Sequence, residues 1–245
     1  MRSLSRTSVL ARVTAATLAG ALLVSCGSSS DSDGDGASAD SAAPGAGSTL
    51  PFAYGSAPCP AADGSTTKPA SFAGAPMKCI VDGATYDAVV TTNHGEFTIK
   101  LDVADSPGTV NNFVALSRYH YYDGTGCHRV ISGFVVQCGR PGSDEGAPGY
   151  TIPDELPAAG AYAEGVVAMA NVGAPNTGGG QWFIITGPDG AALPPQYSIV
   201  GTVTAGYDTT VKALEALADP AAANGVPPSS PIEITSIRII ETPPG

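Results

Sequence analysis

The sequence predicts a mainly β fold, in which a closed antiparallel barrel has helices at its ends. After residue 85 the chain contains many short apolar stretches separated by glycine and proline turns, and only two stretches show helical periodicity. Alternating βαβ units, which place a helix between successive strands, do not fit this pattern. The chain has 245 residues, of which 43% are hydrophobic, enough for one domain with a full core once the amino-terminal region is set aside.

Eight stretches are candidate strands, and the first two form a predicted hairpin. Residues 88–92 and 97–101 flank an Asn-His-Gly segment at 93–95. The second stretch alternates strictly between apolar and polar residues, as a half-buried strand does. The other candidate strands lie near residues 128–131, 134–138, 166–169, 182–186, 198–204 and 232–240.

Two helices are expected. The first begins at Ser106-Pro107, which has the form of an N-cap followed by proline at the first helical position. The second covers residues 209–218, where Val211 and Leu214 contribute to a modest apolar stripe. Both helices therefore have one face to bury against the barrel.

Residues 1–25 have the layout of a secretory leader. Three arginines precede an apolar run over 13–24 that is too short to be a comfortable membrane span. The run ends in Leu-Val-Ser-Cys at Cys26, which resembles the lipobox of bacterial lipoproteins. That resemblance implies a lipid on Cys26 and a location on the outer face of the cytoplasmic membrane or elsewhere in the cell envelope. The alternative is an ordinary cleaved leader that leaves Cys26 as an odd thiol.

Residues 26–50 form a tract rich in Ser, Gly, Ala and Asp, and we expect a flexible tether there because it has almost nothing apolar to bury. The leader carries three arginines and no acid, so its removal changes the formal net charge from −11 to −14. An acidic chain of this kind argues against binding to nucleic acid, whose phosphates need Lys and Arg. We expect the protein to be a monomer.

Four cysteines remain after Cys26, and they allow three pairings. Two pairings are local, Cys59 with Cys79 and Cys127 with Cys138. The second pair is centred on a plausible turn between two short strands, where cross-strand neighbours lie close enough to be bridged. A redox-active dithiol is the competing interpretation, although ten intervening residues do not resemble a CxxC site.

The stretch 51–85 is rich in Pro, Gly and Ala, and it contains one of the local cysteine pairs. We expect a disulfide-pinned loop region there, not a separate domain. The compact domain is expected to cover residues 86–241.

Two short stretches contain most of the candidate chemistry. Residues 127–137 read CHRVISGFVVQ, and residues 169–171 read MAN and run on to GQWFI at 180–184. Together they offer one permanent cation, two side-chain amides and several large apolar groups, without a nucleophile, metal cluster or phosphate loop. Such a set of side chains indicates a reaction on an uncharged group of the substrate.

Both stretches closely resemble the signature segments of the cyclophilin family of peptidyl-prolyl isomerases. The resemblance implies an eight-stranded barrel capped by two helices, and isomerase activity on X-Pro bonds without cofactor or metal. Because of the leader-like segment, we expect the substrates to be exported proteins. The residues that fall on the family's site positions, in the same order, are Arg129, Phe134, Gln137, Ala170, Asn171, Gln181 and Phe183.

Rotation about an X-Pro bond is opposed by amide resonance, a barrier of about 18–20 kcal/mol. A fixed donor aimed at the prolyl nitrogen of the twisted amide lowers this barrier, and a guanidinium suits the task because it stays charged and presents several donors in a rigid plane. The resemblance implies that Arg129 is this catalytic residue.

The substrate must also be gripped. We expect a pocket for the prolyl ring, and hydrogen bonds to the flanking peptide from two glutamines and an asparagine. The pocket residues are Phe134, Val135, Phe183 and Leu193, the hydrogen-bonding residues are Gln137, Asn171 and Gln181, and Ala170 and Tyr197 complete the predicted substrate-binding set.

Several positions depart from the family pattern. Tyr197 stands where many members have His, and Val135 replaces a frequent Met. Ala192 occupies the place of a Trp found in strongly cyclosporin-binding members, so we expect weak cyclosporin binding. Strict pairing in the hairpin would put Arg129 and Gln137 on opposite faces, so a bulge is needed if both serve one site.

The alternatives are a binding module that keeps the proline site without catalysis and, on weaker grounds, a redox protein using Cys127 and Cys138. A zinc site is not expected, since the three histidines include no pair at metal-ligand spacing on a helix.

Overall fold

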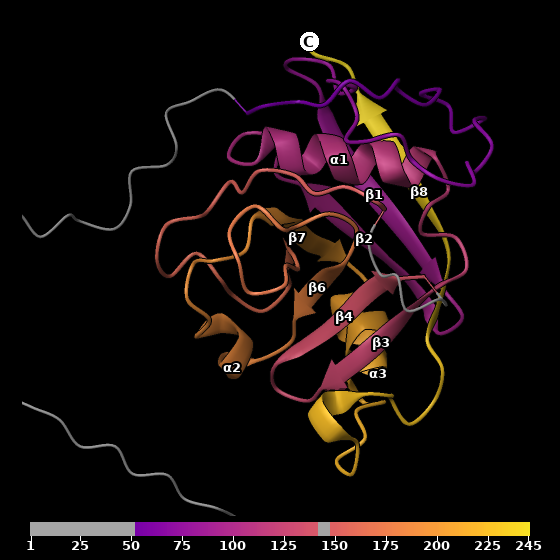
Figure 1. Ribbon diagram of the computed structural model, residues 1–245. Helices are drawn as coiled ribbons and strands as arrows, with labels where there is room; N and C mark the ends of the chain where they lie inside the picture. Colours follow the sequence, from indigo (N-terminus) through magenta and orange to yellow (C-terminus); the bar gives the residue numbers. More distant parts are fainter. Residues whose placement is uncertain (1–51, 142–147) are drawn as a thin grey trace, which may run out of the picture. The chain divides into compact units, whose positions relative to one another are not determined.

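The computed structural model describes residues 52–141 and 148–245. Eight strands close into a barrel in the order β1-β2-β7-β5-β6-β4-β3-β8, and the paired strands are antiparallel (Figure 1). The fold class and all eight candidate strands are confirmed. The strands are β1 (Thr85–Thr92), β2 (Gly95–Leu101), β3 (Thr125–Ile131), β4 (Val135–Arg140), β5 (Val166–Met169), β6 (Trp182–Ile185), β7 (Ile199–Ala205) and β8 (Glu233–Thr242). The predicted leader, Cys26 and the tether lie outside the described residues.

The helix α1 (Pro107–Arg118) crosses one end of the barrel (Figure 1). Its start at Pro107 was predicted, but the capping residue was not. Ser106 occupies the N-cap position without a side-chain capping bond, and the Glu155 carboxylate instead accepts hydrogen bonds from the backbone nitrogens of Gly108 and Thr109 at 2.9 and 2.7 Å. A carboxylate is stabilised there because it meets unpaired N–H groups and the positive end of the helix dipole.

The second predicted helix is shorter and less regular than expected. A π-helical turn, η1 (Tyr207–Val211), runs directly into one turn of α-helix, α3 (Lys212–Glu215). Its apolar stripe does face the core, because Val211 and Leu214 are fully buried. Two short elements were not predicted, the single turn α2 (Pro188–Ala191) and the turn η2 (Ala223–Gly225).

The main core fills the barrel and is closed by apolar residues of α1 and α3. Trp182 lies near its centre without exposed surface. Its ring meets those of Phe97, Phe113 and Tyr122 edge-on, with centroids 6.5, 6.1 and 6.4 Å away. Such aromatic packing gives the barrel a rigid interior on which an outer-face site can be built.

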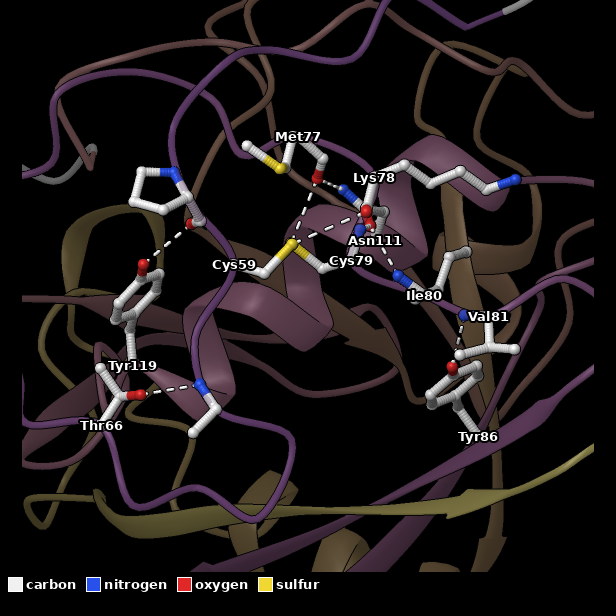
Figure 2. The surroundings of a disulfide bond; sticks show 12 residues. Cys59, Thr66, Met77, Lys78, Cys79, Ile80, Val81, Tyr86, Asn111 and Tyr119 are labelled. Carbon is white, nitrogen blue, oxygen red and sulfur yellow. Dashed lines mark hydrogen bonds between the residues drawn. A yellow bond between two sulfur atoms is a disulfide. The ribbon is translucent and has the colours of Figure 1, made fainter.

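An amino-terminal arm, residues 52–84, precedes the barrel and contains no helix or strand. The predicted disulfide between Cys59 and Cys79 is confirmed, with Cα atoms 5.4 Å apart. Asn111 of α1 holds the arm, since its Oδ1 accepts from Cys79 N at 2.6 Å and its Nδ2 donates to Met77 O at 3.0 Å (Figure 2). None of the helices in the described ranges is long and apolar enough to cross a bilayer.

Candidate active site

The β3–β4 hairpin contains the bulge that Arg129 and Gln137 need if they are to serve one site. Cys127 pairs with Cys138, but two residues further on Arg129 pairs with Gln137, so one residue of β4 is matched by two of β3. His128 is the extra residue. The bulge brings Arg129 and Gln137 to the same face of the sheet, whereas continuous pairing would have set Arg129 opposite Val136.

The Cys127–Cys138 disulfide closes the hairpin just beside this bulge, as predicted. The two cysteines are 2% and 0% exposed, and both belong to the main core. Burial of this kind is typical of a structural bond, whereas reactive cysteines are partly exposed.

The site lies on the outer face of the barrel, over β4, β5 and β6. In β4, Val136 and Cys138 point into the main core, so Val135 and Gln137 point out. In β6, Trp182 and Ile184 point in, so Phe183 points out. The register places Gln137 directly opposite Phe183, so an amide and an aromatic ring become neighbours across the two strands.

A second apolar cluster, here called the apolar patch, forms on this outer face. It is buried at its base and half-buried at its edge, so part of it meets solvent. Val135 and Phe183, at the base, are 2% and 5% exposed. The base consists of Val135, Tyr162, Val166, Ala168, Phe183 and Ile185, and Phe134, Ala170, Ala191, Leu193, Tyr197 and Ile199 pack against it. All four predicted pocket residues therefore belong to one cluster.

Arg129 is half-buried and lies beside the apolar patch. Its Nε donates to the backbone oxygen of Asn224 at 3.0 Å, and its Nη1 lies 3.5 Å from Gln137 Oε1. The Arg129 Cζ is 5.3 Å from the centre of the Phe134 ring, which places the guanidinium over an aromatic wall of the patch. The cation is thus oriented by three neighbours.

The two predicted glutamines form a pair. Gln137 Nε2 donates to Gln181 Oε1 at 2.9 Å, which links the Arg129 side of the site to the segment before β6. The backbone oxygen of Gln181 accepts from Ala170 N at 2.9 Å. These bonds place a row of polar groups along one border of the apolar patch.

Asn171 is also in the site, but its side chain is already bonded within the protein. Its Nδ2 donates to Gln196 O at 2.9 Å, and its Oδ1 accepts from Gly173 N at 3.0 Å. These two bonds hold the segment after β5 in place. The Asn171 side chain therefore shapes the chain path, and its backbone is the part suited to meet a peptide.

Tyr197 packs its ring edge-on against Phe183, with centroids 5.2 Å apart. Sequence reasoning missed the residue that holds it. Tyr162, which is 5% exposed, donates from its hydroxyl to Tyr197 O at 2.7 Å and accepts from Tyr197 N at 2.9 Å. Burial raises the pKa of Tyr162 to about 12.

His128, the bulge residue, lies close to two cations. Burial, together with the smaller effect of the positive charges on Arg140 and Arg129, lowers the pKa of its imidazole to about 4. Its Nδ1 is buried and has no hydrogen-bond partner among the described residues. His128 is therefore neutral near pH 7, and the fixed positive charge of the site comes from arginine.

Within residues 52–141 and 148–245, no group of three or more His, Cys, Asp or Glu residues could hold a metal ion. The chemistry that these residues offer is a fixed cation, amide hydrogen bonds and an apolar surface.

Comparison with known proteins identifies the family. The family described as "Cyclophilin type peptidyl-prolyl cis-trans isomerase/CLD" matches residues 88–239. The chain is 33% identical over 178 residues to the probable peptidyl-prolyl cis-trans isomerase B of Mycobacterium leprae, covering 66% of this chain and 59% of that protein. It is 40% identical over 134 residues to peptidyl-prolyl cis-trans isomerase B of Streptomyces anulatus, covering 48% of this chain and 75% of the relative.

A solved structure agrees with this result. The crystal structure of a Cryptosporidium parvum cyclophilin type peptidyl-prolyl cis-trans isomerase superposes with a TM-score of 0.56 at 31% identity, covering 65% of this chain and 99% of that one. A second structure of that protein, in the presence of the dipeptide Ala-Pro, gives a TM-score of 0.55. The chain therefore belongs to the cyclophilin type peptidyl-prolyl cis-trans isomerase family.

Proposed function

We propose that this protein catalyses cis-trans isomerisation of X-Pro peptide bonds, with Arg129 as the catalytic residue. The observation that supports this most strongly is the position of Arg129. Its guanidinium is held by Asn224 O at 3.0 Å and lies 5.3 Å from the Phe134 ring centre, at the border of the apolar patch. A cation and an apolar surface side by side are what a prolyl amide requires.

In the planar ground state the prolyl nitrogen shares its lone pair with the carbonyl group. As the bond twists this sharing is lost, and the nitrogen becomes pyramidal and able to accept a hydrogen bond. An N–H of Arg129 directed at that nitrogen stabilises the twisted state more than the planar one, which lowers the barrier without breaking any covalent bond. Because the donor is already oriented by its neighbours, little reorganisation is needed during the reaction.

The rest of the site grips the substrate. The prolyl ring packs on the half-buried Phe134 and Leu193, above Phe183 at the base of the patch, where burial contributes about 25 cal/mol per Å² of apolar surface. The Gln137–Gln181 pair bonds the flanking peptide groups. Neutral hydrogen bonds worth about 1 kcal/mol each allow binding and release. The relative from C. parvum, crystallised with Ala-Pro, supports a proline-containing ligand here.

We further propose that the substrates are exported proteins and that the monomeric enzyme is anchored by a lipid on Cys26. The supporting observations are the leader-like sequence and two disulfides, since disulfides persist in oxidising compartments. Mass spectrometry of the mature protein and its Cys26→Ser variant tests the anchor. The expected result is a mature chain that begins at Cys26 with added acyl mass, and an unmodified Cys26 in the wild type would contradict it.

Weak cyclosporin binding belongs to the same proposal, because Ala192 is exposed and offers only a methyl group where strongly binding members have an indole. Titration with cyclosporin of the wild type and of an Ala192→Trp variant tests this. Tighter binding by the variant is expected, and equal binding would contradict the reasoning.

The isomerase proposal is tested by exchange NMR on an Ala-Xaa-Pro-Phe peptide. Uncatalysed exchange takes tens to hundreds of seconds, so catalysis at micromolar protein appears as cross-peaks between the cis and trans signals of the peptide. If the peptide binds, shown by shifted protein signals, without faster exchange, the protein is a proline-binding module and the proposed activity is wrong. A redox role is less favoured, because the disulfide beside the site is buried.

A further inference from the structure

The loop between α3 and β8 presents one backbone oxygen to the side chain of Arg129. Asn224 O accepts the hydrogen bond from Arg129 Nε at 3.0 Å, although the two residues are 95 positions apart in the sequence. A guanidinium has its N–H groups in one rigid plane, so fixing the Nε–H direction also fixes where the Nη groups point. The contact leaves those Nη groups as the donors for a substrate.

The position of this oxygen is set by an unusual backbone turn. Asn224 has φ 56° and ψ 25°, and Gly225 has φ 71°, so two consecutive residues are in the left-handed region. Asn and Gly are the residues that adopt this conformation most readily. The sequence at 224–225 is therefore matched to the turn that directs the Asn224 carbonyl group at Arg129.

The turn also lies directly against the strand that carries Arg129. A Cβ atom on Gly225 would be 2.4 Å from Val130 O and 2.5 Å from Ile131 Cγ1, closer than real contacts allow. The far end of the loop is hydrogen-bonded to the segment after α3, because Ser229 N and Oγ both donate to Leu217 O, at 2.8 and 3.0 Å. The loop therefore packs directly on β3. A residue larger than glycine at position 225 would prevent this close contact between the loop and the strand.

From these contacts we infer that the Asn224-Gly225 turn is a positioning element for Arg129, which acts by holding the guanidinium in its catalytic orientation. This inference rests on the proposed isomerase function. The turn itself does not touch the substrate, and it acts through Arg129 alone. Its loss is therefore expected to lower kcat while KM changes by less than about twofold, because substrate contacts on the apolar patch are kept.

Two variants disturb the turn in different ways. Asn224→Val keeps a backbone oxygen but disfavours a positive φ, since β-branched residues rarely adopt it. Gly225→Ala adds the clashing Cβ. Each is expected to reduce kcat/KM about 10-fold or more, as misplacement of a catalytic group by about 1 Å can do. Asn224→Gly, the conservative variant, keeps both the left-handed backbone and the oxygen, and is expected to behave far closer to wild type than Asn224→Val does.

Gly124→Ala is the matched control for Gly225→Ala. Gly124 also has a positive φ, 78°, but an added Cβ there meets no atom within 4 Å. It therefore introduces similar backbone strain away from Arg129. Loss of activity in Gly124→Ala equal to that in Gly225→Ala would mean that general destabilisation explains the effect, and the inference would be wrong.

Two further measurements separate positioning from mere stability. The Nε–Hε signal of Arg129 in the ¹⁵N spectrum is expected to exchange slowly with water in wild type and faster in Asn224→Val. In an Arg129→Lys background, which lacks the Nε–H, Asn224→Val is expected to cause no further loss of kcat. Unchanged Hε exchange, or a full additional loss in the double variant, would overturn the inference. Measuring Hε exchange does not require an active enzyme. If the wild type shows no catalysis, the proposed function is refuted, but the Hε exchange rates still decide whether the turn orients Arg129.

Discussion

Tyr162→Phe removes a single oxygen atom that holds the wall of the apolar patch. The Tyr162 hydroxyl bonds both the oxygen and the nitrogen of the Tyr197 backbone, at 2.7 and 2.9 Å. The phenol is protonated at neutral pH, as any tyrosine is, so it serves as donor and acceptor together, and burial raises its pKa further, to about 12. The substitution therefore breaks two hydrogen bonds at once while leaving the aromatic ring in place.

A typical hydrogen bond contributes about 1 kcal/mol, and a buried group left without a partner costs about 1–3 kcal/mol. Tyr197 is half-buried, so water reaches its backbone groups only in part. We expect the free energy of unfolding to fall by about 2 kcal/mol. The Tyr197 ring also packs on Phe183, with ring centroids 5.2 Å apart. Greater mobility of Tyr197 should therefore raise KM for a proline peptide more than it lowers kcat.

Urea unfolding gives the stability change, and exchange NMR at several peptide concentrations gives KM and kcat. The matched control is Tyr119→Phe, which removes the same atom from a more exposed single hydrogen bond to Pro58 O at 2.8 Å. A loss of about 0.5 kcal/mol is expected there. Equal losses of stability in the two variants, or a fall in kcat at constant KM in Tyr162→Phe, would refute the reasoning.

Two other predictions concern the disulfides and the bulge histidine. After treatment with mild reductant and an alkylating agent, mass spectrometry should find Cys59 and Cys79 modified first, because Cys59 is exposed. The buried Cys127 and Cys138 should remain unmodified. Simultaneous modification of all four cysteines would contradict this. Folding lowers the pKa of His128 from 6.5 to about 4, so the folded state favours the neutral imidazole ring. The stability that the neutral ring provides is fully present above pH 6.5 and is lost as the pH falls toward 4, because the unfolded chain binds the proton first. Thermal melts across this range should show a smaller acid-induced loss in His128→Gln than in wild type, and parallel curves would disprove the assignment.

Local patterns predicted all eight strands and both disulfides. The alternation in residues 97–101 reflects a strand with one face in the core, and this requires only neighbours in sequence. The need for a bulge could also be derived, because side chains in a strand alternate between its faces and Arg129 must share a face with Gln137. The pattern did not show that His128 was the extra residue, since that depends on how β3 and β4 pair as a whole.

The contacts that orient the site could not be predicted in the same way. Asn224 acts through its backbone oxygen, which every residue has, so no side-chain pattern marks it. Tyr162 reaches Tyr197 across 35 positions, and Glu155 caps α1 across more than 40, and both contacts depend on tertiary packing. The residues predicted for the site have distinctive side chains, and the structure brings them together, but the residues that hold them in place were not predicted.

The role of Arg129 is tested most directly by comparing wild type with Arg129→Ala in exchange NMR on one X-Pro peptide, with the folded state of both checked by their amide spectra. We expect the variant to keep the wild-type spectrum outside the site and to bind the peptide, while catalysed cis-trans exchange falls by at least about 100-fold, the scale expected when a main electrostatic donor is lost. Catalysed exchange at the wild-type rate in a folded Arg129→Ala variant would contradict the central claim that this guanidinium stabilises the twisted amide.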